Sequence, residues 1–415
     1  MRNVILDNVR PFVNGKFEKP TKMCLVDGNW AGEAPEGTEV VDGRGALALP
    51  ALFGLGLDFK EPLRDDIYTF KDGVDAMRRG GFYGGLYESS ANAIDDSLKL
   101  AAIQQISAKY GLSIAFLGAF SKNYLCKDLS EMVELAQGGV VGFGDGNQDC
   151  SRTRFLRLAM EYGSMTGKRF FFMPLDDSLR HHGLVHEGCY ADTLGMKGIP
   201  RVAETVSAFR ILEMARFLKV PVHFKQVSCG ETLKLIETAR AQGVDVTCDV
   251  DIYHLLIDDS CLLELNSNCN VPMPFRSADD REALWKGLES GVVNAISMNH
   301  DPVLAQDKEV NFEDAVPGAV SLETALPAIW KPLSERLGAA RAVELLSAAP
   351  AQLAGVPAAK LASGERAELV LLDPETPTDV APSMFAGQVH NSPLLGKQLP
   401  SSILGTYING EWRGV

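Results

Sequence analysis

The chain has 415 residues, a hydrophobic fraction of 46% and a formal net charge of -14. This length allows a large core, and the acidic balance argues against a nucleic-acid binder, which needs a basic face. The sequence has no apolar run of about 18 residues, so we expect no membrane contact. No signal-peptide pattern is present, which predicts a cytoplasmic protein. The eight cysteines are scattered without a CxxC pair, and we expect reduced, buried thiols.

The first fifty residues contain short β-like segments separated by Gly, Pro and Asn turns. From about Leu52 the pattern changes to apolar strand candidates that alternate with helices. Eight strand candidates can be counted, at residues 52–58, 83–89, 112–119, 140–145, 169–175, 221–227, 245–251 and 294–299. Eight parallel strands with helices between them predict a (β/α)₈ TIM barrel.

The helices between these strands carry recognisable start signals and apolar faces. Asp95 or Asp96 is expected to cap one helix, and Pro200 to open another. Residues 230–241 and 278–288 are predicted to be helical in the same way. The expected buried face of the first helix is Leu98, Ala102, Ile103, Ile106 and Tyr110, and that of the second is Val202, Val206, Phe209, Leu212 and Phe217.

After about Ala351 the chain returns to β-like segments, at residues 367–372 and 402–408. We therefore predict a small β-sheet domain formed by both chain ends, residues 1–50 and 351–415. The barrel domain is predicted over residues 51–350.

Polar residues follow the first predicted barrel strand, where a parallel barrel places its chemistry. The run from Leu55 to Pro62, Leu-Gly-Leu-Asp-Phe-Lys-Glu-Pro, resembles the first metal-binding strand of dihydroorotases, Asp-x-His-x-His-Leu-Arg-Glu-Pro. The segments Phe312–Ala315 and Leu322–Pro327 are also similar to that family, and further matches cover essentially the whole chain. The resemblance implies a barrel of the metal-dependent amidohydrolase type.

The family resemblance implies a binuclear zinc site built from histidines and carboxylates, but most of these ligands are absent here. The corresponding positions are Gly56, Asp58, Asp145, Pro174, Gln226 and Asn299. Lys60 stands where the family has a substrate-binding arginine, Ser90 where it has an asparagine, and Asn299 cannot exchange a proton. We therefore expect no catalytic residues and no zinc. If an ion binds at all, its ligands would be Asp58, Asp145 and His300.

These losses lead us to predict a non-catalytic dihydroorotase-like subunit. By the resemblance it would support assembly or regulation of the aspartate transcarbamoylase catalytic subunit in pyrimidine biosynthesis, as a homodimer within a larger hetero-oligomer. The alternative is an active amidohydrolase that cleaves the C–N bond of a cyclic amide with an altered, mononuclear zinc site. A third hypothesis is a self-assembling scaffold without that partner.

Other candidate residues favour structural roles. We expect His223, His254 and His300 to make structural hydrogen bonds, while a loop cluster of His181, His182 and His186 could in principle chelate a metal. Only one of Asp176 and Asp177 can face a pocket, because adjacent residues on an extended segment point to opposite sides. Cys229 lacks a partnered base. The Gly-rich run at residues 142–146 lacks the lysine of a phosphate loop.

Overall fold

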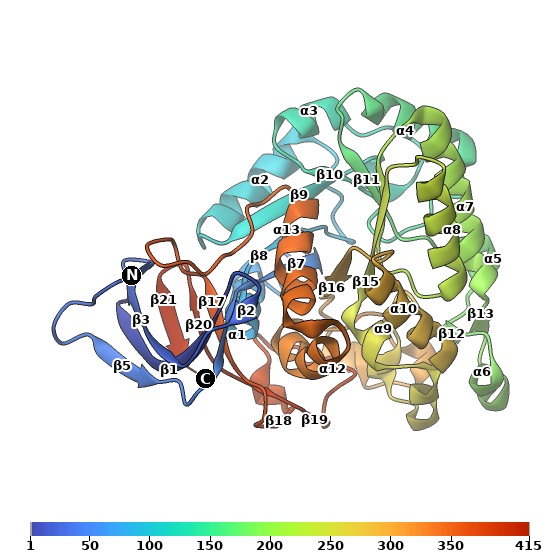
Figure 1. Cartoon of the computed structure of the whole chain (residues 1–415). Helices are drawn as coiled ribbons and strands as arrows, with labels where there is room; N and C mark the ends of the chain where they lie inside the picture. The colour runs from blue at the N-terminus through green and yellow to red at the C-terminus, as the bar shows by residue number, and fades with distance from the viewer. Residues whose placement is uncertain (1, 415) are drawn as a thin grey trace.

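The computed structural model describes residues 2–414 and contains the predicted barrel (Figure 1). Its eight strands are all parallel and pair in chain order. A backbone bridge between Leu57 and His300 joins the first strand to the segment after the last. The strands are β7 (Leu52–Leu57), β8 (Phe82–Tyr87), β9 (Ser113–Ala119), β10 (Gly142–Gly144), β11 (Arg169–Phe172), β14 (Val222–Phe224), β15 (Val246–Asp251) and β16 (Ala295–Ser297).

Helices surround the barrel because their apolar faces pack on the strands. They are α1 (Phe70–Gly80), α2 (Ser97–Ala108), α3 (Met132–Gln137), α4 (Thr153–Ser164), α7 (Arg201–Leu218), α8 (Gly230–Ala241), α10 (Ala278–Ser290), α12 (Leu322–Val343) and α13 (Ala349–Leu353). Short elements lie in the loops: α5 (Asp177–Arg180), β12 (Val185–His186), α6 (Cys189–Leu194), β13 (Gly198–Ile199), α9 (Ile252–Leu256), α11 (Ala305–Lys308), β18 (Thr378–Asp379) and β19 (Gln398–Leu399). No helix within residues 2–414 is long and apolar enough to cross a membrane.

Both chain ends form a separate nine-stranded sheet beside the barrel, which confirms the predicted architecture (Figure 1). Its N-terminal strands are β1 (Val4–Val13), β2 (Lys16–Phe17), β3 (Thr21–Val26), β4 (Asn29–Ala31), β5 (Glu39–Asp42) and β6 (Leu47–Pro50). Its C-terminal strands are β17 (Leu369–Asp373), β20 (Ser402–Ile408) and β21 (Glu411–Gly414). The halves join where β17 pairs antiparallel with β6. A second apolar core, which includes Leu25, Leu371 and Tyr407, lies in this sheet.

The predicted faces of two helices are wrong in part. Asp96 caps α2 as expected, but Leu98 is 81% exposed and Leu100 is buried instead. On α7 the expected apolar face is mostly in solvent; Val202, Val206, Phe209 and Phe217 are 46–70% exposed, and only Leu212 is buried. The face that packs inward carries small residues such as Ala203, Ala208 and Ala215. Small side chains let α7 approach the barrel closely, which periodicity alone does not reveal.

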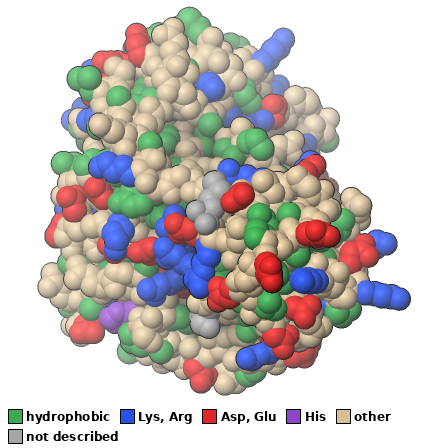
Figure 2. Space-filling model, turned by 90° about the vertical axis from the view of Figure 1, so that its left-hand side faces the viewer, with side chains coloured by type: hydrophobic (Ala, Val, Ile, Leu, Met, Phe, Trp, Pro, Cys, Tyr) green, Lys and Arg blue, Asp and Glu red, His purple; other side chains and the backbone are tan. Residues whose placement is uncertain are grey.

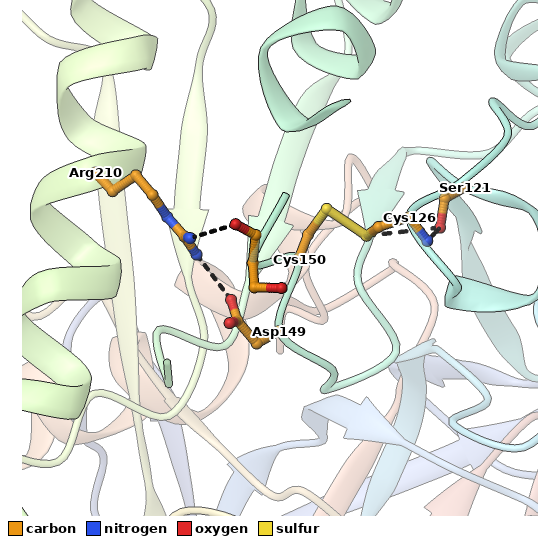
Figure 3. Close-up of a disulfide and its surroundings, with 6 residues drawn as sticks. Ser121, Cys126, Asp149, Cys150 and Arg210 are labelled. Atoms are coloured by element: carbon orange, nitrogen blue, oxygen red, sulfur yellow. Dashed lines mark hydrogen bonds and ion pairs between the residues drawn. A yellow bond between two sulfur atoms is a disulfide. The ribbon is translucent and has the colours of Figure 1, made fainter. Parts of the chain in front are cut away.

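The expectation that all cysteines are reduced is also wrong, because Cys126 and Cys150 form a disulfide (Figure 3). Their Cα atoms lie 5.8 Å apart, although the two cysteines are separated by 24 residues in the sequence. A pair so far apart in the chain has no local motif that would predict the disulfide. Beside the disulfide, the Asp149 carboxylate accepts a hydrogen bond from Arg210 of α7 at 2.8 Å. The loop after β10 is thereby held on both sides.

Candidate functional site

One buried lysine connects the carboxyl ends of three barrel strands. Lys225 follows β14, and its Nζ lies 2.5 Å from Glu88 Oε2 and 2.8 Å from Asp145 Oδ1. Glu88 and Asp145 follow β8 and β10, and all three side chains are at most 8% exposed. Burial raises the pKa of both carboxyl groups, although Lys225 opposes the rise. Burial works to lower the pKa of Lys225, but the two carboxylates outweigh it and raise that pKa.

Backbone groups fix the orientation of both carboxylates independently of the lysine. Gly146 N donates to Glu88 Oε1 at 2.9 Å, Asn147 N donates to Asp145 Oδ1 at 3.0 Å, and Met173 N donates to Asp145 Oδ2 at 2.7 Å. A side chain at Gly144 would collide with the Glu88 carboxylate. The Gly-rich run at residues 142–146 therefore accommodates Glu88 and supplies one of these backbone donors, Gly146 N.

A second lysine repeats this arrangement on the opposite part of the rim. Lys60 Nζ lies 2.7 Å from Asp58 Oδ2, after β7, and 2.5 Å from Asp301 Oδ1, after β16. The Ser90 hydroxyl also donates to Asp58 Oδ2, at 2.5 Å. Burial raises the pKa of Asp301. For Lys60, burial works to lower the pKa, but Asp301 and Asp58 outweigh it and raise that pKa. We call Lys60, Asp58, Asp301, Lys225, Glu88 and Asp145 the barrel-mouth cluster.

Three residues of this cluster were predicted from the sequence as site positions, namely Asp58, Asp145 and Lys60, whereas Lys225, Glu88 and Asp301 were missed. Glu88 was visible as the charged residue near the end of a strand candidate, and Lys225 as a charge near the end of an apolar strand. Both positions are signals of a site at the carboxyl end of a barrel. The missing histidines are a stronger signal in the sequence than the charged residues beside them.

The remaining predicted positions surround the barrel-mouth cluster. Asn299 Nδ2 donates to Asp251 Oδ2 at 2.7 Å and to Ser297 Oγ at 3.0 Å. The Asn299 amide oxygen fills the space that a side chain at Gly56 would need. Gln226 and Asn299 have φ values of 55° and 41°, a left-handed conformation that is uncommon outside glycine and often marks functional sites. Pro174 is buried just after β11.

The three candidate core histidines have structural partners, as expected. His223 Nε2 lies 2.9 Å from Asp249 Oδ2 in the barrel interior, and burial lowers the pKa of His223. His254 Nε2 lies 3.1 Å from the Met273 carbonyl oxygen. His300 Nδ1 accepts from Ser321 N at 3.2 Å, and its Nε2 lies 3.4 Å from the Tyr68 hydroxyl. Burial lowers the pKa of His300 to about 3.

The loop candidates do not form a second site. His181 and His182 are exposed, whereas His186 is buried and lies 3.2 Å from Arg276. Asp176 caps α5 and is bonded to Ser178 and Leu179 of that helix. Burial raises the pKa of Cys229, so this thiol is not an activated nucleophile.

The residues present do not fit a zinc ion. Asp58 and Asp145 each bind a different lysine, and both ring nitrogens of His300 have other partners. Within residues 2–414 there is no group of three or more His, Cys, Asp or Glu side chains arranged to hold a metal. A tetrahedral zinc site needs convergent, unprotonated nitrogen, sulfur or oxygen donors. At the barrel mouth, ammonium groups occupy the positions between the carboxylates.

A cavity of about 30 Å³ remains at the barrel mouth, among Asp58, Glu88, Asn147, Lys225 and Asn299. Asp58 Oδ1 and Asn147 Oδ1 are buried acceptors without a hydrogen-bond partner in the described part of the chain, and both residues line this cavity. A buried water molecule needs at least about 10–15 Å³ of such space and two to four polar partners. The site therefore has the size and the polarity to hold water next to Glu88.

Comparison with known proteins shows similarity over nearly the whole chain, although no family model matches. The chain is 33% identical to a "Dihydroorotase-like protein" of Pseudomonas aeruginosa, covering 92% of this chain and 91% of that protein. It is 30% identical to a dihydroorotase of Pelotomaculum thermopropionicum, covering 96% and 95%. An L-hydantoinase structure from Arthrobacter aurescens superposes with a TM-score of 0.81 at 20% identity, covering 99% and 96%.

These relatives contradict the prediction that the chain is not an enzyme. Proteins named dihydroorotase match it at 28–31% identity over 91–96% of its length, and solved hydantoinases share its fold. The prediction equated the loss of zinc ligands with the loss of all chemistry. The barrel mouth instead retains buried acid and base groups at the strand ends, where barrel enzymes place them.

Proposed function

The chain belongs to the dihydroorotase-like amidohydrolases, and from this membership we propose that it hydrolyses a C–N bond of a cyclic amide at the barrel mouth. The similarity to proteins named dihydroorotase along almost the entire chain carries the proposal. The strand-end position of the barrel-mouth cluster supports it, because loops at this end of a barrel form its active site.

Glu88 is the acid–base residue in this proposal. It lines the cavity in which Asp58 Oδ1 and Asn147 Oδ1 can hold a water molecule. The ionised carboxylate takes a proton from this water as its oxygen bonds to the amide carbon, and returns that proton to the ring nitrogen as the C–N bond breaks. Burial raises the pKa of Glu88 toward neutral pH. A general acid–base catalyst works best when its pKa lies near the pH at which the enzyme operates.

Lys225 and Lys60 supply the positive charge at the site. Each ammonium group lies between two carboxylates from different strands, the position that a divalent cation takes in a carboxylate site. We therefore propose that the side chains of the barrel-mouth cluster carry out the reaction. They would take the place of the mononuclear zinc site that the alternative hypothesis from the sequence assumed. The cavity admits water and not a ring, so substrate entry requires the loops carrying Asn147 and Pro272 to move apart.

Ring opening of dihydroorotate, dihydrouracil and hydantoin by the purified protein tests this function. We expect turnover of at least one ring, and a loss of about 100-fold or more in kcat for Glu88→Gln. Glu161→Gln on the exposed face of α4 is the matched control. If folded protein opens none of the three rings above the buffer rate, the proposed function is wrong.

The predicted partner, the aspartate transcarbamoylase catalytic subunit, stays a prediction, as do the homodimer and the cytoplasmic location. The exposed apolar face of α7, formed by Val202, Val206, Phe209 and Phe217, favours an assembly. Co-expression with the transcarbamoylase of the same host, followed by size-exclusion chromatography, tests it. Failure to co-elute at micromolar concentration would exclude a stable complex without bearing on hydrolysis.

A further inference from the structure

A second cavity lies away from the barrel mouth, between α1, α12 and strands β20 and β21 of the terminal sheet. We call it the lateral cavity. Its volume is about 610 Å³, within the range of about 300–1,000 Å³ that is usual for small-molecule sites. The hydrolytic function proposed above uses none of its residues.

Two polar atoms at the lateral cavity lack partners. Glu323, on α12, is only 3% exposed; its Oε1 accepts a hydrogen bond from Ala386 N at 2.8 Å, while its Oε2 has no partner within residues 2–414. The Ser402 hydroxyl, on β20, is likewise buried and unpartnered there. Leaving such a buried group unpaired has a free-energy cost, because the group has lost its hydrogen bonds to water. Both residues line the same cavity, although neither of these two oxygens is in contact with solvent. If the two side chains turn toward the cavity, a ligand that donates to Glu323 and bonds Ser402 would remove that cost.

Arginines contribute positive charge to the same cavity. Arg79 Nη1 is held by the carbonyl oxygens of Met384 and Phe385 at 3.0 and 3.1 Å, and its Nη2 makes no hydrogen bond within residues 2–414. Arg413 of β21 also lines the cavity and pairs with Asp75 at 3.2 Å. Lys and Arg side chains gather near the middle of the terminal-sheet side of the molecule (Figure 2). The anchored guanidinium of Arg79 can bind an anion without first being ordered.

The neighbouring residues narrow the class of ligand. Pro327, Met384 and Ile403 provide apolar walls, which suit a ring or a short chain. Asp379 lines the cavity as well, and Asp75 already partly neutralises Arg413. This acidic surrounding disfavours a doubly charged phosphate and favours a single carboxylate beside Arg79.

We propose that the lateral cavity binds a small organic carboxylate with an apolar body and a hydroxyl or amide at its far end. The carboxylate pairs with Arg79, the apolar body packs against Pro327 and Ile403, and the far polar group bonds Glu323 Oε2 and Ser402 Oγ. The inference stands independently of the hydrolytic function.

Three probes test the carboxylate, the apolar body and the far polar group separately. The first, 4-hydroxyphenylacetate, has all three; phenylacetate lacks the hydroxyl, and 2-(4-hydroxyphenyl)ethanol lacks the negative charge. Binding to the full-length protein is measured by ligand-observed NMR titration. For a ligand of this size we expect a dissociation constant of about 1 mM or lower for 4-hydroxyphenylacetate. The other two probes should bind at least about fivefold more weakly.

Substitutions locate the bound probe. Arg79→Gln and Glu323→Gln should each weaken 4-hydroxyphenylacetate binding by about tenfold, whereas Arg154→Gln, an exposed arginine on α4, should leave it unchanged. Arg79 is exposed, and the melting temperature of the variant checks that losing its hydrogen bonds to Met384 and Phe385 leaves the protein folded. The proposal is overturned if 4-hydroxyphenylacetate does not bind at a concentration about 10-fold above the expected dissociation constant of about 1 mM. It is also overturned if binding survives both Arg79→Gln and Glu323→Gln.

Discussion

The barrel mouth and the lateral cavity differ in how their charged side chains are paired. At the mouth, each ammonium group contacts two carboxylates, and the remaining space is about 30 Å³. In the lateral cavity, Glu323 and Arg79 each have an atom without a hydrogen-bond partner in residues 2–414, beside a space of about 610 Å³. A charged site that supplies its own counter-ions is suited to holding water. A site with unmatched polar atoms and room around them is suited to a ligand.

The largest expected effect comes from removing a counter-ion at the mouth. Lys225→Met leaves Glu88 and Asp145 buried side by side without positive charge, which should lower the free energy of unfolding by about 3–5 kcal/mol. Lys71→Met breaks the exposed Lys71–Asp75 pair and should cost less than about 1 kcal/mol. Urea denaturation measures both. Equal losses would mean that Lys225 does not neutralise the site.

The buried carboxyl group of Glu323 should make stability depend on pH. Burial raises the pKa of Glu323 to about 7, so between its ordinary pKa and 7 the folded state holds a proton that the unfolded state has lost. Stability from this group is complete below about pH 4.5 and is lost as pH rises toward 7. The loss is on the order of 3 kcal/mol. The difference between wild type and Glu323→Gln, measured by denaturation from pH 4.5 to 8, should show this slope; a pH-independent difference would contradict it.

Lys225 lies between two carboxylates, where a metal ion could otherwise bind. Replacing Lys225 with a metal-binding side chain should therefore let a metal ion bind there. Lys225→His places an imidazole toward Glu88 and Asp145, and the imidazole is shorter than lysine by roughly one zinc–nitrogen bond of about 2 Å. Zinc at 100 times its dissociation constant should stabilise this variant by about 2.7 kcal/mol. Wild type and Lys71→His should show no shift in melting temperature with zinc or a chelator. Stoichiometric zinc in desalted wild type would overturn the proposed role of the lysines.

The smallest effect tests the close packing of the mouth. Gly144→Ala adds a methyl group where the Glu88 carboxylate lies, and displacing Glu88 from Lys225 should cost about 1–3 kcal/mol. Gly32→Ala meets no atom within 4 Å and should change stability by less than about 0.5 kcal/mol. Thermal denaturation compares the two. A harmless Gly144→Ala would mean that Glu88 can rearrange freely.

Sequence patterns predicted the barrel and the terminal sheet well, because alternating strands and helices leave a strong periodic signal. They failed for features that depend on tertiary packing, namely which face of a helix is buried and which charged residues meet. The apolar residues Val202 and Phe209 of α7 point to solvent, since the small residues on the other face allow closer approach to the barrel. At the site, absent histidines are visible in sequence, but Lys225 approaching Glu88 from a distant strand is a tertiary contact that no local spacing encodes.

The contact between Gly56 and Asn299 constrains how this protein can change. Any side chain at Gly56 would have to enter the space of the Asn299 amide, on a backbone whose φ of 74° already disfavours one. Restoring a histidine at this position alone would therefore create a clash before it created a ligand. The Asn299 amide must therefore move or be replaced before position 56 can accept a side chain. A mutational path toward a histidine at this position crosses a less stable intermediate if Gly56 changes first, so the order of the two substitutions matters.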